Sequence, residues 1–202
     1  MKVESFKKSH FFIAVLGMLL LHSCKVNSQV GHERKVSINS DWKFHLNDSI
    51  KDRDTISAAT QWRKLDLPHD WSIEGRFDEK SKAGVGGGAL NGGLGWYKKN
   101  FKIEAEDSNK ITSVVFDGVY RNSQVWINGH YLGKRPNGYI TFQYNLSHYL
   151  NYGNKENEII VKVDNSKQPN SRWYSGSGIF RNVWLETTDK LHVAPWGTYI
   201  TT

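Results

Sequence analysis

The fold class of this chain is indicated most clearly by residues 124–132, where the sequence is QVWINGHYL. Two apolar-rich runs flank the pair Asn128-Gly129. An Asn-Gly pair in this setting favours a two-residue type I′ turn, because both turn residues must adopt a positive φ. The stretch therefore predicts a hairpin of two antiparallel strands.

Short strands are also predicted on both sides of this hairpin, where apolar and polar residues alternate with a period of two. They cover residues 35–38, 42–46, 96–103, 113–116, 140–144, 158–164, 181–186 and 191–194. Turn-forming pairs, Gly153-Asn154 and Asn165-Ser166, separate the later strands. Outside the N-terminal segment, no long window shows the 3.6-residue apolar period of a helix. This pattern predicts an all-β fold, an antiparallel jelly-roll β-sandwich.

Two long gaps interrupt the regular spacing of the strands, from Ile73 to Gly95 and from Lys167 to Gly178. Irregular loops of this length in a compact domain are usually functional or disordered. We therefore expect a binding site in these two loops.

The N-terminal segment has the pattern of an export signal. Three lysines precede an apolar run, Phe11–Leu21, which is too short to span a bilayer as a helix. The run ends in Leu-His-Ser-Cys, which resembles a bacterial lipoprotein cleavage site. We predict that residues 1–24 are a signal peptide, that Cys24 is lipidated and that residues 25–34 form a tether. The alternative is a soluble secretory signal in which Cys24 has no role.

Composition excludes some functions and leaves others open. The net charge is +7, of which the N-terminal signal contributes +2, and the remaining charges of both signs are interspersed. This distribution argues against a nucleic-acid partner. Cys24 is the only cysteine, so the rest of the chain contains no disulfide. The 8 Trp, 9 Tyr and 9 Phe suit either a sandwich core or the stacking of sugar rings.

The segment LPHDW, residues 67–71, and the glycine-rich run AGVGGGALNGGLGW, residues 83–96, each allow two interpretations. His69 and Asp70 suit either a buried structural corner or a contact to a ligand hydroxyl. The glycines do not form a phosphate-binding loop, because the Gly-Lys-Ser/Thr ending and a following helix are missing. They suit either a loop at the rim of a pocket or a flexible surface loop.

The second gap contains PNSRWYSGSGIFR, residues 169–181, which concentrates an amide, a guanidinium, hydroxyls and large rings. This mixture suits a sugar, since a sugar ring has hydrogen-bonding edges and an apolar face. Arg172 can bind two neighbouring hydroxyls through its planar fork, and Trp173 or Tyr174 can stack. Alternatively, the aromatic residues cover the end of the sandwich and Arg172 pairs with a surface carboxylate.

These motifs, with FDGVYRNSQVWINGHYLGKRPNGYITFQYNLS at residues 116–147, resemble the N-terminal sugar-binding domain of family 2 glycoside hydrolases. The resemblance covers residues 35–196, and the order and spacing of the motifs match. The sequence is most similar to β-galactosidases of gut-type Bacteroidetes, and less similar to β-glucuronidases and β-mannosidases.

The resemblance implies a larger enzyme. In that family an immunoglobulin-like domain and a (β/α)₈ barrel follow, and two barrel glutamates carry out a retaining hydrolysis. Residues 197–202 would begin the linker to the next domain. The expected activity of the full-length parent is the hydrolysis of terminal β-galactosides, and this segment alone should be inactive. The alternatives are a stand-alone carbohydrate-binding lipoprotein, a purely structural sandwich, and the same domain of a β-glucuronidase or β-mannosidase.

The resemblance also implies which residues contact the β-galactoside. Relatives commonly present a carboxylate in the loop where this chain has Asn170, Ser171 and Arg172, so neither a metal site nor a cofactor is expected. The predicted substrate contacts are Asn170, Arg172, His69, Asp70, Asn91 and Trp173.

Two further expectations concern packing and location. Trp126 and Trp184 lie on predicted strands and are expected in the core. The protein is expected to be exported, as a periplasmic or outer-membrane-anchored lipoprotein that touches the membrane only through its lipid. The segment after Cys24 lacks an acidic cluster, which favours the periplasm.

Overall fold

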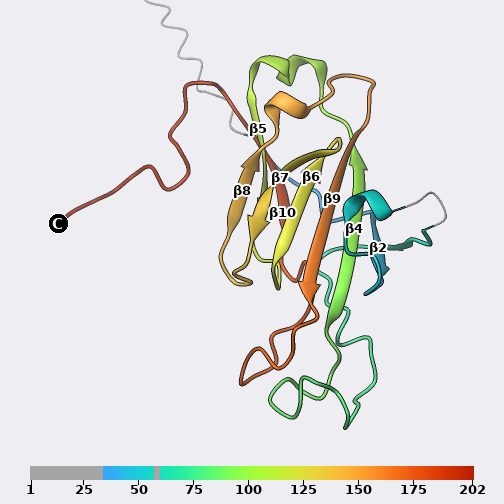
Figure 1. The fold of residues 1–202 in the computed structure, drawn as a ribbon. Coiled ribbons are helices and arrows are strands. Elements are labelled where there is room, and N and C mark those ends of the chain that lie inside the picture. The colour runs from blue at the N-terminus through green and yellow to red at the C-terminus, as the bar shows by residue number, and fades with distance from the viewer. Residues whose placement is uncertain (1–33, 57–59) are drawn as a thin grey trace, which may run out of the picture. The chain divides into compact units, whose positions relative to one another are not determined.

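The computed structural model describes residues 34–56 and 60–202 (Figure 1). The predicted signal peptide, Cys24 and nearly all of the predicted tether lie outside the described residues. Within them, no helix is long and apolar enough to cross a membrane.

In the described residues ten strands form two sheets, and each strand pairing among them is antiparallel. The first sheet has the order β1 (Arg34–Ser37), β10 (Val183–Thr188), β5 (Ile111–Phe116), β8 (Phe142–Asn145). The second has the order β3 (Arg63–Leu65), β2 (Trp42–Leu46), β4 (Gly93–Phe101), β9 (Asn157–Asn165), β6 (Ser123–Ile127), β7 (His130–Arg135). The helical turns of the described residues are three short 3₁₀ segments, η1 (Arg53–Thr55), η2 (Ala105–Asn109) and η3 (Ser147–Tyr149). The predicted all-β sandwich is confirmed.

The central hairpin forms as its sequence predicts. Ile127 pairs with His130 across the turn between β6 and β7. Asn128 and Gly129 have φ angles of 47° and 86°, as a type I′ turn requires. The side chain of Asn128 also donates a hydrogen bond to Oδ1 of Asn157 at the start of β9 (2.8 Å), which ties the turn to the neighbouring strand.

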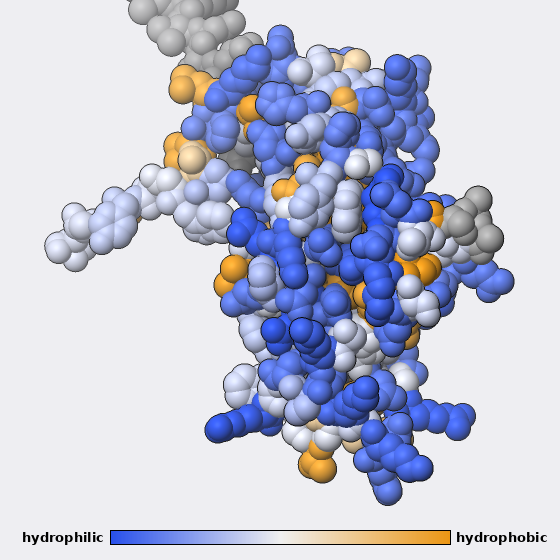
Figure 2. Space-filling view, viewed as in Figure 1, coloured by the Kyte–Doolittle hydropathy of each residue, from blue (hydrophilic) through white to orange (hydrophobic). Residues whose placement is uncertain are grey.

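The core lies between the two sheets and is built by the period-two alternation. In β10, Val183, Leu185 and Thr187 are buried and the residues between them are half-buried. The largest fully buried side chains include Trp42, Tyr97 and Phe116. Figure 2 shows a mostly hydrophilic face with scattered hydrophobic residues, consistent with apolar side chains gathered inside.

The prediction that Trp126 and Trp184 lie in the core is wrong. Both side chains point away from the inter-sheet core, and the residues before and after each of them in the strand are buried. Trp126 packs against a separate cluster of Leu94, Trp96 and Ile160 on the outer side of the six-stranded sheet. Trp184 donates a hydrogen bond to Oδ2 of Asp117 (2.8 Å) on the outer side of the other sheet.

Apart from shifts of one to three residues at several strand ends, the structure differs from the strand predictions as follows. Residues 191–194 form no strand, and the Leu191 side chain is 94% exposed, because no described strand lies beside this segment to pair with it. Strand β3 was not predicted, since its sequence Arg-Lys-Leu is too short and too charged to show alternation. The strand predicted at residues 140–144 begins only at Phe142.

The two long gaps meet at one end of the sandwich. Gly93 at the start of β4 pairs with Asn165 at the end of β9. Because the pairing is antiparallel, the loop before β4 and the loop after β9 leave the sheet at the same end of the strands. Figure 1 shows both loops together beyond the ends of these strands.

Candidate functional site

A pocket of about 520 Å³ lies at this loop end, and we call it the aromatic pocket. Its walls come from three segments that are distant in sequence: residues 120–121, 136–139 and 170–173. The middle segment follows β7 and the last follows β9. The aromatic pocket therefore exists only because the order of the strands brings these connections together.

Three aromatic side chains form one side of the aromatic pocket. The ring of Tyr139 meets the buried Tyr120 edge-on, with centroids 5.3 Å apart. Trp173 donates a hydrogen bond from Nε1 to the hydroxyl of Tyr139 (3.2 Å), which in turn donates to Oγ of Ser175 (3.3 Å). The Trp173 side chain is 61% exposed, so a face of its ring is available to a ligand.

The hydroxyl of Tyr139 in the aromatic pocket is surrounded by groups that stabilise its ionised form. Burial raises the pKa of Tyr139, but hydrogen bonds with Ser175, Trp173 and Tyr120 and the nearby charge of Arg121 outweigh burial. The pKa of this hydroxyl is therefore lowered from its usual value of 10.0. Among these groups Arg121 carries a charge, and it also lines the aromatic pocket.

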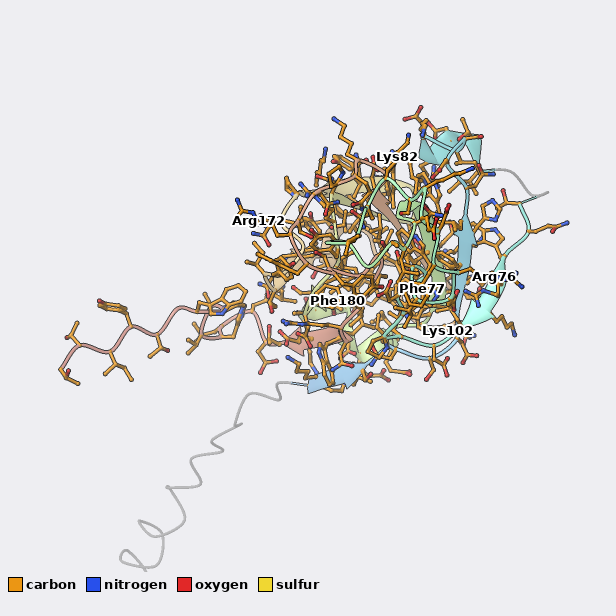
Figure 3. The ribbon with its side chains drawn as sticks, turned by 90° about the horizontal axis from the view of Figure 1, so that it is seen from below. Arg76, Phe77, Lys82, Lys102, Arg172 and Phe180 are labelled. Carbon is orange, nitrogen blue, oxygen red and sulfur yellow. The ribbon has the colours of Figure 1, made fainter. Side chains whose placement is uncertain are left out.

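Arg172, a predicted contact, lies at the lip of the aromatic pocket. Figure 3 shows its side chain directed outward at the edge of the loop end. Its backbone lies close to Gly86, where a Cβ atom would come within 3.3 Å of the Arg172 carbonyl oxygen. The glycine-rich run thus packs against the second loop, as its interpretation as a rim predicts and a free surface loop would not.

Asn170, another predicted contact, uses most of its hydrogen-bonding capacity inside the protein. Its Nδ2 donates to Oδ1 of Asn165 (2.6 Å) and to the carbonyl of Lys167 (3.0 Å). Its Oδ1 accepts a hydrogen bond from the Tyr120 hydroxyl (3.1 Å). Only one lone pair of Oδ1 is left for a ligand. Asn170 therefore mainly holds the pocket wall in place.

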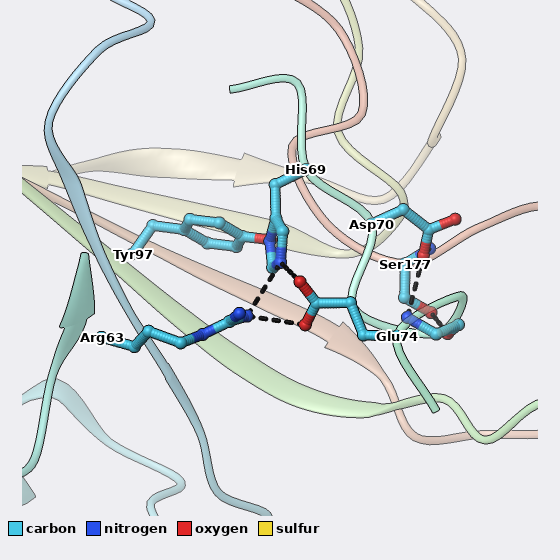
Figure 4. Close-up of polar contacts among 7 residues, drawn as sticks. Arg63, His69, Asp70, Glu74, Tyr97 and Ser177 are labelled. Atoms are coloured by element: carbon cyan, nitrogen blue, oxygen red, sulfur yellow. Dashed lines mark hydrogen bonds and ion pairs between the residues drawn. The ribbon is translucent and has the colours of Figure 1, made fainter. Parts of the chain in front are cut away.

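His69 lies outside the aromatic pocket, in a network with the buried Tyr97 and the exposed Arg63 and Glu74 that we call the His69 network (Figure 4). Its Nδ1 is 2.7 Å from the Tyr97 hydroxyl. Its Nε2 is 3.2 Å from Oε1 of Glu74 and 3.3 Å from Nη2 of Arg63. Both ring nitrogens are therefore occupied by protein partners.

The electrostatics of the His69 network favour a neutral imidazole. Burial lowers the pKa of His69, and the adjacent Glu74 opposes this only in part. Burial also raises the pKa of Tyr97 well above its usual value, so Tyr97 keeps its proton. Although burial alone would raise the pKa of Glu74, the bond from Arg63 lowers it, so this carboxylate is ionised.

Asp70 joins the two loops, and we call its contacts the Asp70 clamp. Its Oδ1 accepts hydrogen bonds from the backbone amides of Ser72 (3.0 Å) and Ser177 (2.8 Å). Its Oδ2 accepts a hydrogen bond from the Tyr174 hydroxyl. Ser72 and Ser177 also bond to each other through their hydroxyls (2.7 Å). These contacts, like those of His69, agree with a buried structural corner.

Comparison with known proteins agrees with this architecture. The model of the family described as glycosyl hydrolases family 2, sugar binding domain, matches residues 34–189. The chain belongs to this family. A β-galactosidase of Bacteroides ovatus is 52% identical over 182 residues, which cover 90% of this chain and 21% of that protein. A putative β-glucuronidase of Formosa agariphila is 40% identical over 188 residues, which cover 93% of this chain and 18% of that protein.

Solved structures show the same relation for this family 2 sugar-binding domain. A β-glycosidase from Bacteroides vulgatus superposes with a TM-score of 0.69 at 46% identity, over 76% of this chain and 20% of that one. A family 2 member from Bacteroides cellulosilyticus superposes with a TM-score of 0.75 at 38% identity, over 83% and 22%. The domain thus spans about a fifth of the length of these relatives.

Asn91 lies in neither the aromatic pocket nor the two networks of the family 2 domain. It lines a separate hollow of about 470 Å³ together with Asp48, Lys80 and Gly92. Its carbonyl accepts a hydrogen bond from Ser72 (2.8 Å). The six predicted contacts are therefore distributed over four places, and only Asn170, Arg172 and Trp173 share the aromatic pocket.

Tyr120, Arg121 and Tyr139 also line the aromatic pocket but are not among the predicted substrate contacts. All three belong to the motif at residues 116–147 that carries the family resemblance. Nothing local in that motif indicates that Tyr139 lies beside Trp173, because the contact follows from the sheet order. In the described part of the chain, no group of three or more His, Cys, Asp or Glu side chains is arranged to hold a metal.

Proposed function

We propose that this chain is the substrate-binding domain of a retaining exo-glycosidase that hydrolyses terminal β-galactosides in carbohydrate degradation. The observation that carries the proposal is the aromatic pocket at the loop end of a family 2 sugar-binding domain. Its exposed Trp173 ring can stack on a sugar face, while Arg172 can bind neighbouring hydroxyls. The similarity to the Bacteroides ovatus β-galactosidase supports the choice of glycoside.

The domain would bind the sugar and leave bond cleavage to other parts of the enzyme. Retaining hydrolysis needs two carboxyl groups about 5–5.5 Å apart, one as nucleophile and one as acid/base. At the loop end, Glu74 is bonded to Arg63 and His69, and Asp70 is occupied by the Asp70 clamp. Neither group is free for this chemistry. The loops would instead close the subsite for the non-reducing sugar over a barrel that carries the catalytic glutamates.

Kinetics of the full-length protein test this proposal. With a p-nitrophenyl β-galactoside, Arg172→Ala should lower kcat/KM by a factor equivalent to about 1–3 kcal/mol, because a charged hydrogen-bond donor to the sugar is lost. The melting temperature should not change, since Arg172 is exposed. Unchanged kinetics with a lower melting temperature would make Arg172 a structural residue. The absence of any glycosidase activity would favour the stand-alone carbohydrate-binding lipoprotein.

A β-glucuronidase is the second candidate, and one specific observation favours it. Arg121 and Arg172 both lie in the aromatic pocket, and a guanidinium suits the carboxylate of a uronic acid. The 40% identity to a putative β-glucuronidase agrees with this choice. Parallel assays on p-nitrophenyl β-glucuronide, β-mannoside and β-galactoside would decide between these activities by their kcat/KM values.

We also propose that the protein is exported and lipidated on Cys24, with the periplasm as its location. The apolar run Phe11–Leu21 and the following Ser-Cys support this proposal. Labelling of growing cells with a radioactive fatty acid should mark the protein in the membrane fraction. Cys24→Ser should abolish the label. Equal labelling of the variant, or an unlabelled and soluble wild type, would contradict the proposal.

A further inference from the structure

The aromatic pocket contains two cations and no carboxylate. Arg121 and Arg172 both line it, whereas its other residues are aromatic, amide, hydroxyl, glycine or proline. Neither guanidinium forms an ion pair within the described residues. The aromatic pocket thus places two guanidinium groups at one cavity with no carboxylate among the residues that line it.

Arg121 is held in position by an aromatic ring. Its guanidinium carbon lies 5.9 Å from the centroid of the Tyr120 ring, which is itself buried. A guanidinium stacked in this way keeps its hydrogen-bond donors free at its edge. The charge of Arg121 also contributes to the lowered pKa of Tyr139 across the pocket. Its charge therefore acts on at least one other residue that lines the pocket.

The positive charge continues into an adjoining hollow. Arg121 is shared with a second cavity of about 250 Å³, which Lys134 and Lys167 also line. Asp164 is the carboxylate in this hollow, and it accepts hydrogen bonds from the backbone amide and hydroxyl of Ser166. Three cations face one carboxylate there, so the surroundings of Arg121 remain positive.

We infer that the aromatic pocket binds a saccharide that carries an acidic group, either a carboxylate or a sulfate. The sugar ring would stack on Trp173 while the acidic group accepts hydrogen bonds from Arg121 and Arg172. Guanidinium forks match the paired oxygens of such anions, and these charge-assisted bonds are about twice as strong as neutral ones. The inference rests on the proposed function, because it takes the ligand to be a saccharide, and it adds the chemical class of that saccharide.

Calorimetric titration of the full-length protein tests the inference. The ligands are three thio-linked disaccharides that resist hydrolysis: a neutral β-galactoside, its 6-sulfated form and a β-glucuronide. Inorganic sulfate at matched ionic strength is the fourth. At least one acidic disaccharide should bind about tenfold more tightly than the neutral one, and free sulfate should bind more weakly than either acidic sugar. The acidic disaccharide that binds more tightly shows whether the site prefers a sulfate or a carboxylate.

Two variants should remove this preference. Arg121→Gln should reduce the affinity for the acidic disaccharide by about tenfold and the affinity for the neutral disaccharide by much less. Arg172→Gln should weaken both, because Arg172 also binds sugar hydroxyls, but the acidic disaccharide should lose about tenfold more affinity than the neutral one. The matched control is Arg181→Gln. Arg181 also stacks over an aromatic ring, that of Phe180 at 5.3 Å, and it lies outside the aromatic pocket. This control should keep the wild-type preference.

The possible failures are distinguishable. Equal affinity for neutral and acidic disaccharides would overturn the inference and leave the proposed function intact. An acidic preference that survives both arginine variants would also overturn it, since the acidic group would then be bound elsewhere. If free sulfate binds as tightly as the sulfated sugar, the inference is overturned, because the site then binds anions in general and does not recognise the sugar. If no disaccharide binds and no glycoside is hydrolysed, the proposed function fails together with the inference.

Discussion

The Asp70 clamp and the aromatic pocket lie at the same end of the sandwich. Both combine charged and aromatic side chains, but only the charged group of the clamp is bonded to partners within the protein. Asp70 directs both carboxylate oxygens to donors of the protein, two backbone amides and the Tyr174 hydroxyl. Arg121 and Arg172 have no carboxylate partner in the described chain, and Trp173 exposes most of its ring. Residues whose polar groups already have partners in the protein therefore hold the loops, whereas residues whose polar groups lack such partners can bind a ligand.

The largest effect on stability is therefore predicted for the substitution of Asp70. Asp70→Ala removes the acceptor for two backbone amides and a hydroxyl, and each hydrogen bond to a charged group contributes about 1.5–3 kcal/mol. Because Asp70 is only half-buried, we expect the free energy of unfolding to fall by about 2–4 kcal/mol, as measured in urea. Asp70→Asn, which keeps the shape and one acceptor, should lose less. Unchanged unfolding with weaker sugar binding would instead make Asp70 a ligand contact.

A smaller effect is expected at Trp173, where sugar binding should change and the free energy of unfolding should not. Trp173→Ala removes the exposed stacking surface and should weaken sugar binding about 3- to 10-fold, which corresponds to about 0.5–1.5 kcal/mol. The urea midpoint should stay constant, because the side chain is mostly exposed. Trp196→Ala is the control, since Trp196 is 76% exposed and lies outside the aromatic pocket. A large loss of stability in Trp173→Ala would show that the ring covers the sandwich.

The His69 network predicts a pH dependence of stability. Burial lowers the pKa of His69 in the folded protein from its ordinary value of 6.5, so below pH 6.5 the unfolded chain binds more protons than the folded one. The free energy of unfolding should therefore be fully present above pH 6.5 and fall as the pH drops towards the lowered pKa.

Urea titrations from pH 7.5 to pH 5 measure this slope. His69→Gln should be less stable than the wild type but flatter across the window, because the titrating group is gone. Glu74 does not interfere, since its pKa is lowered from 4.5 and its contribution is lost only at more acidic pH. An equally steep slope in His69→Gln would place the titrating group elsewhere.

The smallest effect is expected at Asn91. Its side chain is exposed and lines a hollow separate from the aromatic pocket. Asn91→Ala should therefore change sugar affinity less than twofold and stability by less than about 0.5 kcal/mol. A clear loss of affinity would extend the ligand beyond the aromatic pocket, towards the glycine-rich loop.

The candidate site was predicted only as far as its residues are local to one segment. The composition of residues 169–181 led to Arg172, Trp173 and Asn170, and all three line the aromatic pocket. His69 and Asp70 are also polar residues of a loop motif, but their side chains have their partners within the protein. A polar side chain has the same appearance in a sequence whether its partner is a ligand or a backbone amide.

Local patterns in the sequence predict most of the strands, the antiparallel sandwich and the type I′ hairpin, because alternation and turn chemistry act between near neighbours in the chain. Long-range contacts place Arg121 and Tyr139 in one pocket with Trp173, and place Trp126 and Trp184 outside the inter-sheet core. Strand order and the face of each sheet that is covered depend on long-range pairing, such as that of β4 with β9. The site lies where these long-range pairings bring together three connections that are separate in the sequence.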